Sequence, residues 1–155
     1  MFRIFLILFS TLNIVGFSQN NLKPVTWNVI YVPNGSEEGE IHYIATIEKK
    51  WHIYSQRPTD AGPIPTSFTI TPSTDFELIG KVEEGNAHEE YVPAFDAKVF
   101  VFSEKAIFKQ KIKLKNRKSF TIKSTLEFMT CNDAQCLPPA TLEFSVFVPE
   151  YQTKK

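Results

Sequence analysis

The sequence has few cysteines, few glycines and no excess of either charge, and each shortage excludes a class of protein. Two cysteines in 155 residues are too few for a disulfide-built mini-protein or a four-cysteine zinc site. Six glycines exclude collagen-like and glycine-rich chains. With 17 basic and 17 acidic residues, no net charge attracts nucleic acid or an anionic membrane surface.

Apolar and aromatic residues, in contrast, are abundant. Hydrophobic residues make up 43% of the sequence and aromatic residues 14%, including 14 phenylalanines. A chain of this composition can bury a core, and its length suits one domain rather than two. We therefore expect a single folded domain and no disordered protein.

The first residues have the features of a secretory signal peptide. Arg3 gives a positive start, residues 4–9 form an apolar run, and the small residues Gly16 and Ser18 mark a cleavage site. An uncleaved membrane anchor is the alternative, but spanning a bilayer takes about 20 mostly apolar residues. The sequence therefore predicts an exported protein.

Cleavage after residue 18 would leave one mature domain over residues 19–155. We expect this domain in the periplasm, with secretion as the alternative. Either compartment allows a disulfide to persist.

Apolar and polar residues alternate along most of the mature sequence, which predicts strands with one buried face. No stretch shows a helical period, and turn signals such as Asn34-Gly35 separate the segments. The pattern predicts an all-β, immunoglobulin-like antiparallel sandwich, with a closed barrel as the alternative. The longer segments are 25–31, 41–47, 108–114, 120–128 and 142–148, and the shorter ones are 51–55, 66–71, 76–82 and 98–102.

Several candidate sites have simpler explanations. Four lysines at alternate positions from Lys109 to Lys115 could form a basic patch, but they more simply form a solvated strand face that discourages edge pairing. Three histidines are scattered, and the neighbouring residues of His88-Glu89-Glu90 would point to opposite faces of a strand. We expect no metal site and no nucleic-acid partner.

The two cysteines, Cys131 and Cys136, are the strongest chemical signal. Fully extended, their Cα atoms would be about 16 Å apart, whereas a disulfide needs about 4.4–6.8 Å. A bond between them therefore requires a turn, which Asn132-Asp133 favours. A ring this small stabilises a fold by about 2 kcal/mol, against over 4 kcal/mol for a ring of about 60 residues. The chemistry favours a redox pair but leaves a structural loop staple open.

The segment 131–139, preceded by 126–130, resembles the active-site segment of the N-terminal periplasmic domain of the thiol:disulfide interchange protein DsbD. Residues 51–56 resemble that family's strand with two aromatic residues beside the cysteines. Residues 91–98 resemble its cap loop, in which one phenylalanine covers the disulfide. The three segments follow one another along the chain as they do in the family, and the similarity spans roughly residues 24–148. The resemblance implies an immunoglobulin-like sandwich.

The resemblance also implies a function and a set of site residues. The domain would be a protein-disulfide reductase component, relaying reducing equivalents from a thioredoxin-like donor to periplasmic partners. Its partners would be thioredoxin-like proteins or domains and a separately encoded membrane electron-transporting protein, and it would need no cofactor beyond the disulfide. The alternative is a non-catalytic immunoglobulin-like binding module with a structural loop disulfide. The implied redox pair is Cys131 and Cys136, the implied cap is Phe95, and the flanking residues are His52, Tyr54 and Asp133.

The sequence departs from the family pattern at two points within this similarity. The cysteines are separated by four residues, one fewer than in the family. Pro93-Ala94 stands where the family tends to have acidic residues before the cap, so Glu89, Glu90 and Asp96 are the candidates to replace them. The Cys loop contains no Lys, Arg or His, so sequence neighbours alone predict no strongly lowered thiol pKa. We therefore expect fast exchange only when a partner docks.

Cleavage of the signal peptide is directly testable. Protein recovered from the periplasm should begin at Gln19, because the small residues Gly16 and Ser18 mark the cleavage site. Intact-mass analysis would show the loss of residues 1–18. Membrane-bound protein that retains these residues would contradict the prediction.

Overall fold

The computed structural model describes residues 22–58, 62–92 and 95–150. The predicted signal peptide lies outside the described residues, as does Pro93-Ala94 of the predicted cap loop. The described parts contain strands and no α-helix. They therefore include no helix long and apolar enough to cross a membrane.

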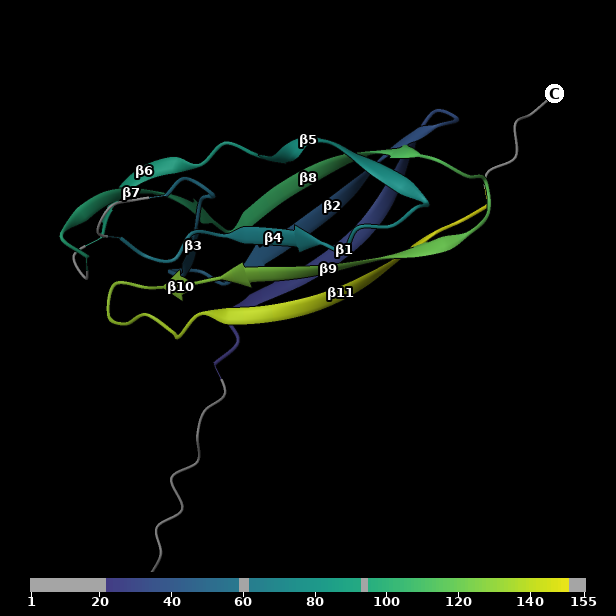
Figure 1. Ribbon diagram of the computed structural model, residues 1–155. Coiled ribbons are helices and arrows are strands. Elements are labelled where there is room, and N and C mark those ends of the chain that lie inside the picture. Colours follow the sequence, from purple (N-terminus) through teal and green to yellow (C-terminus); the bar gives the residue numbers. More distant parts are fainter. Residues whose placement is uncertain (1–21, 59–61, 93–94, 151–155) are drawn as a thin grey trace, which may run out of the picture.

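Antiparallel strands form three sheets in the described residues (Figure 1). The first sheet has the order β1-β2-β8-β5, with β1 (Val25–Asn34), β2 (Glu38–Ile47), β8 (Lys105–Leu114) and β5 (Phe76–Glu84). The second has the order β11-β9-β4, with β11 (Ala140–Val148), β9 (Phe120–Phe128) and β4 (Ser67–Ile70). The third has the order β10-β3-β7-β6, with β10 (Thr130–Cys131), β3 (His52–Tyr54), β7 (Ala97–Ser103) and β6 (His88–Val92).

The first and second sheets pack face to face and enclose the main core. Phe108 of β8 and Leu126 of β9 are fully buried in it. Trp27 of β1 contacts both sheets, since its ring centroid lies 5.9 Å from that of Phe108 and 5.4 Å from that of Phe128. This arrangement confirms the predicted immunoglobulin-like sandwich and excludes the closed barrel.

The alternating sequence pattern explains the long strands. Along β2 every second side chain enters the core, and along β8 Phe108 and Ile112 point inward while the lysines point away. Lys111 pairs with Glu83 of the neighbouring β5 at 2.8 Å. The lysines therefore form a solvated face, as predicted. The prediction that these lysines discourage pairing at a sheet edge was wrong, because β8 is not an edge strand and lies between β2 and β5.

Most predicted strands and the first hairpin are confirmed. Gly35 has φ +79° in the turn between β1 and β2, a left-handed conformation that glycine adopts without strain. Two short strands, β6 and β10, were missing from the prediction. Neither is long enough for an alternating pattern to stand out, and both belong to the third sheet.

The third sheet extends the sandwich at one end (Figure 1). Its strand β10 contains Cys131, and Phe95 lies between β6 and β7. The chain passes from β9 in the second sheet to β10 in the third across the single residue Met129. It passes from β7 to β8 in the first sheet across Glu104, which has φ +63°. The third sheet is therefore tied to both layers of the sandwich.

Candidate functional site: a disulfide on the outer face of the third sheet

The two faces of the third sheet have different neighbours. Because side chains alternate along a strand, Ile53 points to one face and its neighbours His52 and Tyr54 point to the other. Ile53 and Phe102 join the main core. Cys131 pairs with His52 in the ladder between β10 and β3, so its side chain projects from the face opposite the main core.

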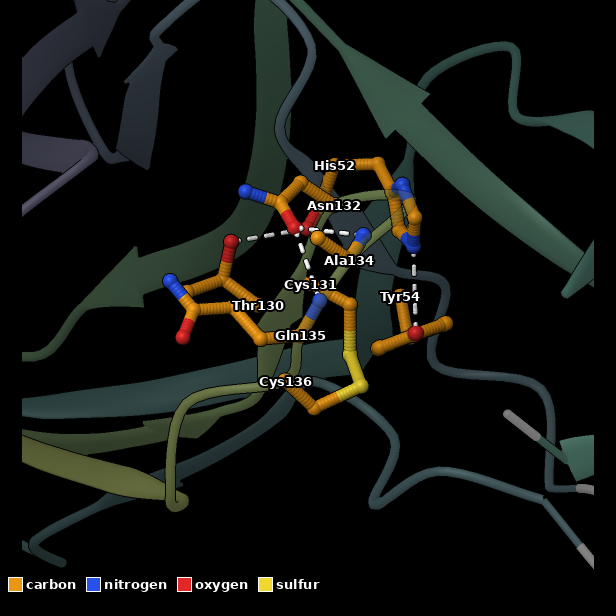
Figure 2. Close-up of a disulfide and its surroundings, with 8 residues drawn as sticks. All are labelled: His52, Tyr54, Thr130, Cys131, Asn132, Ala134, Gln135 and Cys136. Atoms are coloured by element: carbon orange, nitrogen blue, oxygen red, sulfur yellow. Dashed lines mark hydrogen bonds between the residues drawn. A yellow bond between two sulfur atoms is a disulfide. The ribbon is translucent and has the colours of Figure 1, made fainter. Parts of the chain in front are cut away.

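The Cys loop is a compact turn closed by the disulfide (Figure 2). The Cα atoms of Cys131 and Cys136 are 4.0 Å apart. The Asn132 side-chain oxygen accepts hydrogen bonds from the backbone N–H groups of Ala134 and Gln135, each at 2.9 Å. The Asn132 N–H donates to the Gln135 carbonyl, also at 2.9 Å. The turn predicted at Asn132 is therefore confirmed, and its side chain holds it.

Two further hydrogen bonds fix the loop to the sheet. The Thr130 hydroxyl donates to the His52 carbonyl at 2.8 Å. The Leu137 N–H donates to the Thr130 carbonyl at 2.9 Å, just beyond the second cysteine. Both ends of the Cys loop are thus held against β3 by Thr130.

An apolar cluster surrounds the disulfide. Cys131 is fully buried in it, whereas Cys136 is only partly buried and packs against its edge. The Phe95 ring meets the Tyr54 ring edge to face, with centroids 6.3 Å apart. The other members are Val92, Ala97, Val99, Val101 and Met129. The two cysteine residues are therefore unequally buried.

His52 and Tyr54 form a polar pair within these apolar surroundings. The His52 Nε2 atom lies 3.1 Å from the Tyr54 hydroxyl, and the two rings are nearly perpendicular. Burial lowers the pKa of His52, although the nearby carboxylates of Glu90 and Asp133 act in the opposite direction. Burial raises the pKa of Tyr54, as does the charge of Glu90. Both side chains therefore favour their neutral forms.

The structure distinguishes the three acidic residues proposed to replace the family's acidic pair. Glu90 pairs with Val99 in the ladder and faces the same side as His52. Glu89 points to the other face and pairs with Lys98 at 3.2 Å. Asp96 accepts a hydrogen bond from the Tyr91 hydroxyl at 2.6 Å. Glu90 is therefore the acidic residue of β6 that faces the site.

The predicted site residues gather at this end of the molecule. Cys131, Cys136, Phe95 and Tyr54 share the apolar cluster, and His52 adjoins it through Tyr54. Asp133 lies at the exposed tip of the Cys loop and lines a cavity of about 260 Å³ together with His52. The roles assigned to these residues remain predictions. Among the described residues no group of His, Cys, Asp and Glu could hold a metal ion.

Sequence reasoning missed the residues that support the site. Val99 and Val101 belong to the buried cluster that contains Cys131, and Met129, in the crossing between two sheets, packs against this cluster. Thr130 holds both ends of the Cys loop. The alternation of Ala97, Val99 and Val101 was visible in the sequence, but the face that they share with Cys131 was not.

The fold and the site together define a class of domain: an immunoglobulin-like sandwich with a disulfide at one end, in an apolar cluster with Tyr54 and Phe95. The family model described as thiol:disulfide interchange protein DsbD, N-terminal, matches residues 22–148. The chain therefore belongs to the DsbD N-terminal domain family. Curated proteins show no significant sequence match.

Solved structures share the fold at low sequence identity. The reduced DsbD N-terminal domain from Neisseria meningitidis is 13% identical, with a TM-score of 0.52 over 79% of this chain and 87% of that chain. The N-terminal periplasmic domain of ScsB from Proteus mirabilis is 12% identical, with a TM-score of 0.53 over 81% of this chain and 47% of that chain. A complex between the DsbD and PilB N-terminal domains from Neisseria meningitidis matches at 13% identity and a TM-score of 0.50, over 81% and 87%.

The position of Phe95 predicts that this side chain limits access to the reduced cysteines. Phe95→Ala should speed the reaction of the reduced pair with a bulky maleimide several-fold, because the ring packs against the cluster that contains Cys131. Mass spectrometry of timed samples measures the rate. The matched control is Phe147→Ala, since Phe147 lies on β11 and is 63% exposed. Equal rates in Phe95→Ala and wild type, with unchanged circular dichroism, would remove Phe95 from the site.

Proposed function

We propose that this domain is a periplasmic thiol–disulfide exchange module that relays reducing equivalents from a thioredoxin-like donor to periplasmic partner proteins. The observation that carries the proposal is the unequal burial of the two bonded cysteine residues on the outward face of the third sheet. Membership of the DsbD N-terminal family supports the chemistry. A similar structure described as a complex of DsbD and PilB N-terminal domains supports a protein partner.

The burial pattern supports one order of the exchange steps. A thiolate of the donor attacks the sulfur of Cys136, which is partly exposed, and the disulfide breaks with its electron pair on Cys131. A second donor thiolate then attacks the donor sulfur of the mixed disulfide and releases Cys136 as a thiolate. Each round transfers two electrons to the domain. Cys131, which is fully buried, is reached by no partner and serves as the resolving cysteine.

Delivery to an acceptor runs through the same atoms in reverse. The Cys136 thiolate attacks the acceptor's disulfide and forms a mixed disulfide. Cys131 then attacks the sulfur of Cys136, re-forms the intramolecular disulfide and releases the reduced acceptor. The surrounding apolar side chains keep water and small oxidants away from Cys131 between these events.

The disulfide can open without loss of the fold. A ring of this size contributes about 2 kcal/mol, whereas a domain is typically stable by about 5–15 kcal/mol. The main core lies on the other face of the third sheet, where Ile53 and Phe102 contact it. Reduction therefore alters the outer cluster and leaves the sandwich intact.

Cysteine variants test the proposed function. Cys131→Ser should trap a mixed disulfide with a thioredoxin-like partner, because it keeps the accessible sulfur and removes the resolving one. A reducible band on a non-reducing gel measures the trapping. Cys136→Ser is the matched control and should trap at least about tenfold less, since its remaining thiol is buried.

The double variant separates exchange from stability. Cys131→Ser/Cys136→Ser should unfold cooperatively in denaturant with a free energy lower by about 2 kcal/mol, and it should show no exchange. If neither single variant traps a partner and the double variant is unfolded at ambient temperature, the disulfide is structural. The binding-module alternative would then hold.

A further inference from the structure

A row of side chains crosses the third sheet at the disulfide. Cys131 forms an isolated bridge with Cys136 on one side and pairs with His52 on the other. His52 in turn pairs with Ser103 of β7. Directly opposed residues of antiparallel strands project from the same face, with Cβ atoms about 4.5–5.5 Å apart. The imidazole therefore leaves the sheet on the same face as the side chain of the buried cysteine, and its Nε2 atom points to the Tyr54 hydroxyl (Figure 2).

His52 lies between the apolar cluster and a polar cavity. The side chain is only 5% exposed, and its Nε2 atom is engaged by the Tyr54 hydroxyl. The cavity beyond it, about 260 Å³ in volume, is lined by Ser103, Glu90 and Asp133 as well as His52. A proton on the imidazole thus has a polar route to solvent that does not cross the apolar cluster.

The ionisable groups around His52 come from every neighbouring element. Glu90 of β6 and Asp133 of the Cys loop favour a protonated imidazole, and His88 of β6 opposes it. His88 itself lies 3.5 Å from Glu90. Burial outweighs the carboxylates, so the pKa of His52 is below its ordinary value. The imidazole is therefore neutral near pH 7 and can accept a proton, while the carboxylates stabilise the cation that results.

The remaining cavity wall is electrically balanced. The turn before β3 supplies Glu48, Lys49 and Lys50, and the turn after β7 supplies Glu104. Two acidic and two basic groups leave no net charge from this wall. The nearest excess charge is that of Glu90 and Asp133.

We propose that His52 accepts the thiol proton of Cys131 in the step that resolves the mixed disulfide, an inference that rests on the exchange function proposed above. The S–H bond of Cys131 breaks and its proton moves to the imidazole. The sulfur of Cys131 bonds to that of Cys136, and the bond between Cys136 and the partner's sulfur breaks. The partner leaves as a thiolate with the two electrons, and His52 later loses the proton through the polar cavity.

An aromatic disulfide with a coloured leaving thiolate isolates this step. Fully reduced protein is mixed with one equivalent of the reagent. The first release of colour reports attack by Cys136, and the second reports attack by Cys131 on the resulting mixed disulfide. Both phases are followed by stopped-flow absorbance across the pH range from weakly acidic to weakly alkaline. No protein partner is needed.

The wild-type second phase should speed up with pH and level off below neutrality, where His52 becomes neutral. In His52→Gln it should be at least about tenfold slower at weakly acidic pH, since general-base catalysis is worth about 10²–10⁴-fold. The second-phase rate of this variant should keep rising with pH until the pH reaches the ordinary thiol pKa of about 8.5. The first phase should not change. His42→Gln is the matched control, because His42 lies on β2 and contacts Glu40.

An unchanged second-phase pH profile in folded His52→Gln would overturn the inference. If that variant does not fold, a titration of reduced wild-type protein by NMR decides. The His52 pKa must coincide with the midpoint of the wild-type profile, and a mismatch also overturns the inference. Absence of the first phase would instead contradict the proposed function, so the two failures are distinguishable.

Discussion

The two-residue pairing between β10 and β3 determines where the disulfide lies and how it is surrounded. It sets Cys131 opposite His52 and Thr130 opposite Ile53, so that the first pair faces outward and the second pair faces inward. The outward face receives the disulfide, Tyr54 and Phe95, and the inward face contacts the main core. A register shift of one residue would turn Cys131 toward the core and expose Thr130 instead. The disulfide and the main core thus occupy opposite faces of one small sheet.

This separation is compatible with the proposed exchange at the disulfide. In the outer cluster Phe95 and Met129 are only partly buried, whereas Phe108 and Leu126 in the main core are fully buried. The third sheet is joined to both layers of the sandwich through Met129 and Glu104. The site is therefore held by a scaffold that does not depend on the bond being made or broken.

The sequence predicted the sandwich because its long strands each bury one face, as the alternation from Phe108 to Leu114 shows. It predicted the turn at Asn132, whose side chain holds the Cys loop. It did not predict β10, because two residues contain no period. The alternating pattern also did not pair His52 with Cys131, because this register joins residues 79 positions apart. The Cys loop contains no basic residue, so the sequence around Cys131 did not indicate a basic group next to it. The resemblance to the DsbD N-terminal domain placed His52 at the site without giving it a role.

The central claim is that the bond between Cys131 and Cys136 is made and broken in function. Its reduction potential tests this most directly, because a structural bond resists the reductants that a relay must accept electrons from. Equilibration of the purified domain with defined ratios of a reduced and oxidised dithiol, followed by alkylation and mass spectrometry, gives the value. The account predicts a potential near or above about −250 mV, in the range of thioredoxin-like exchange proteins. A value below about −300 mV, typical of structural disulfides, would contradict it.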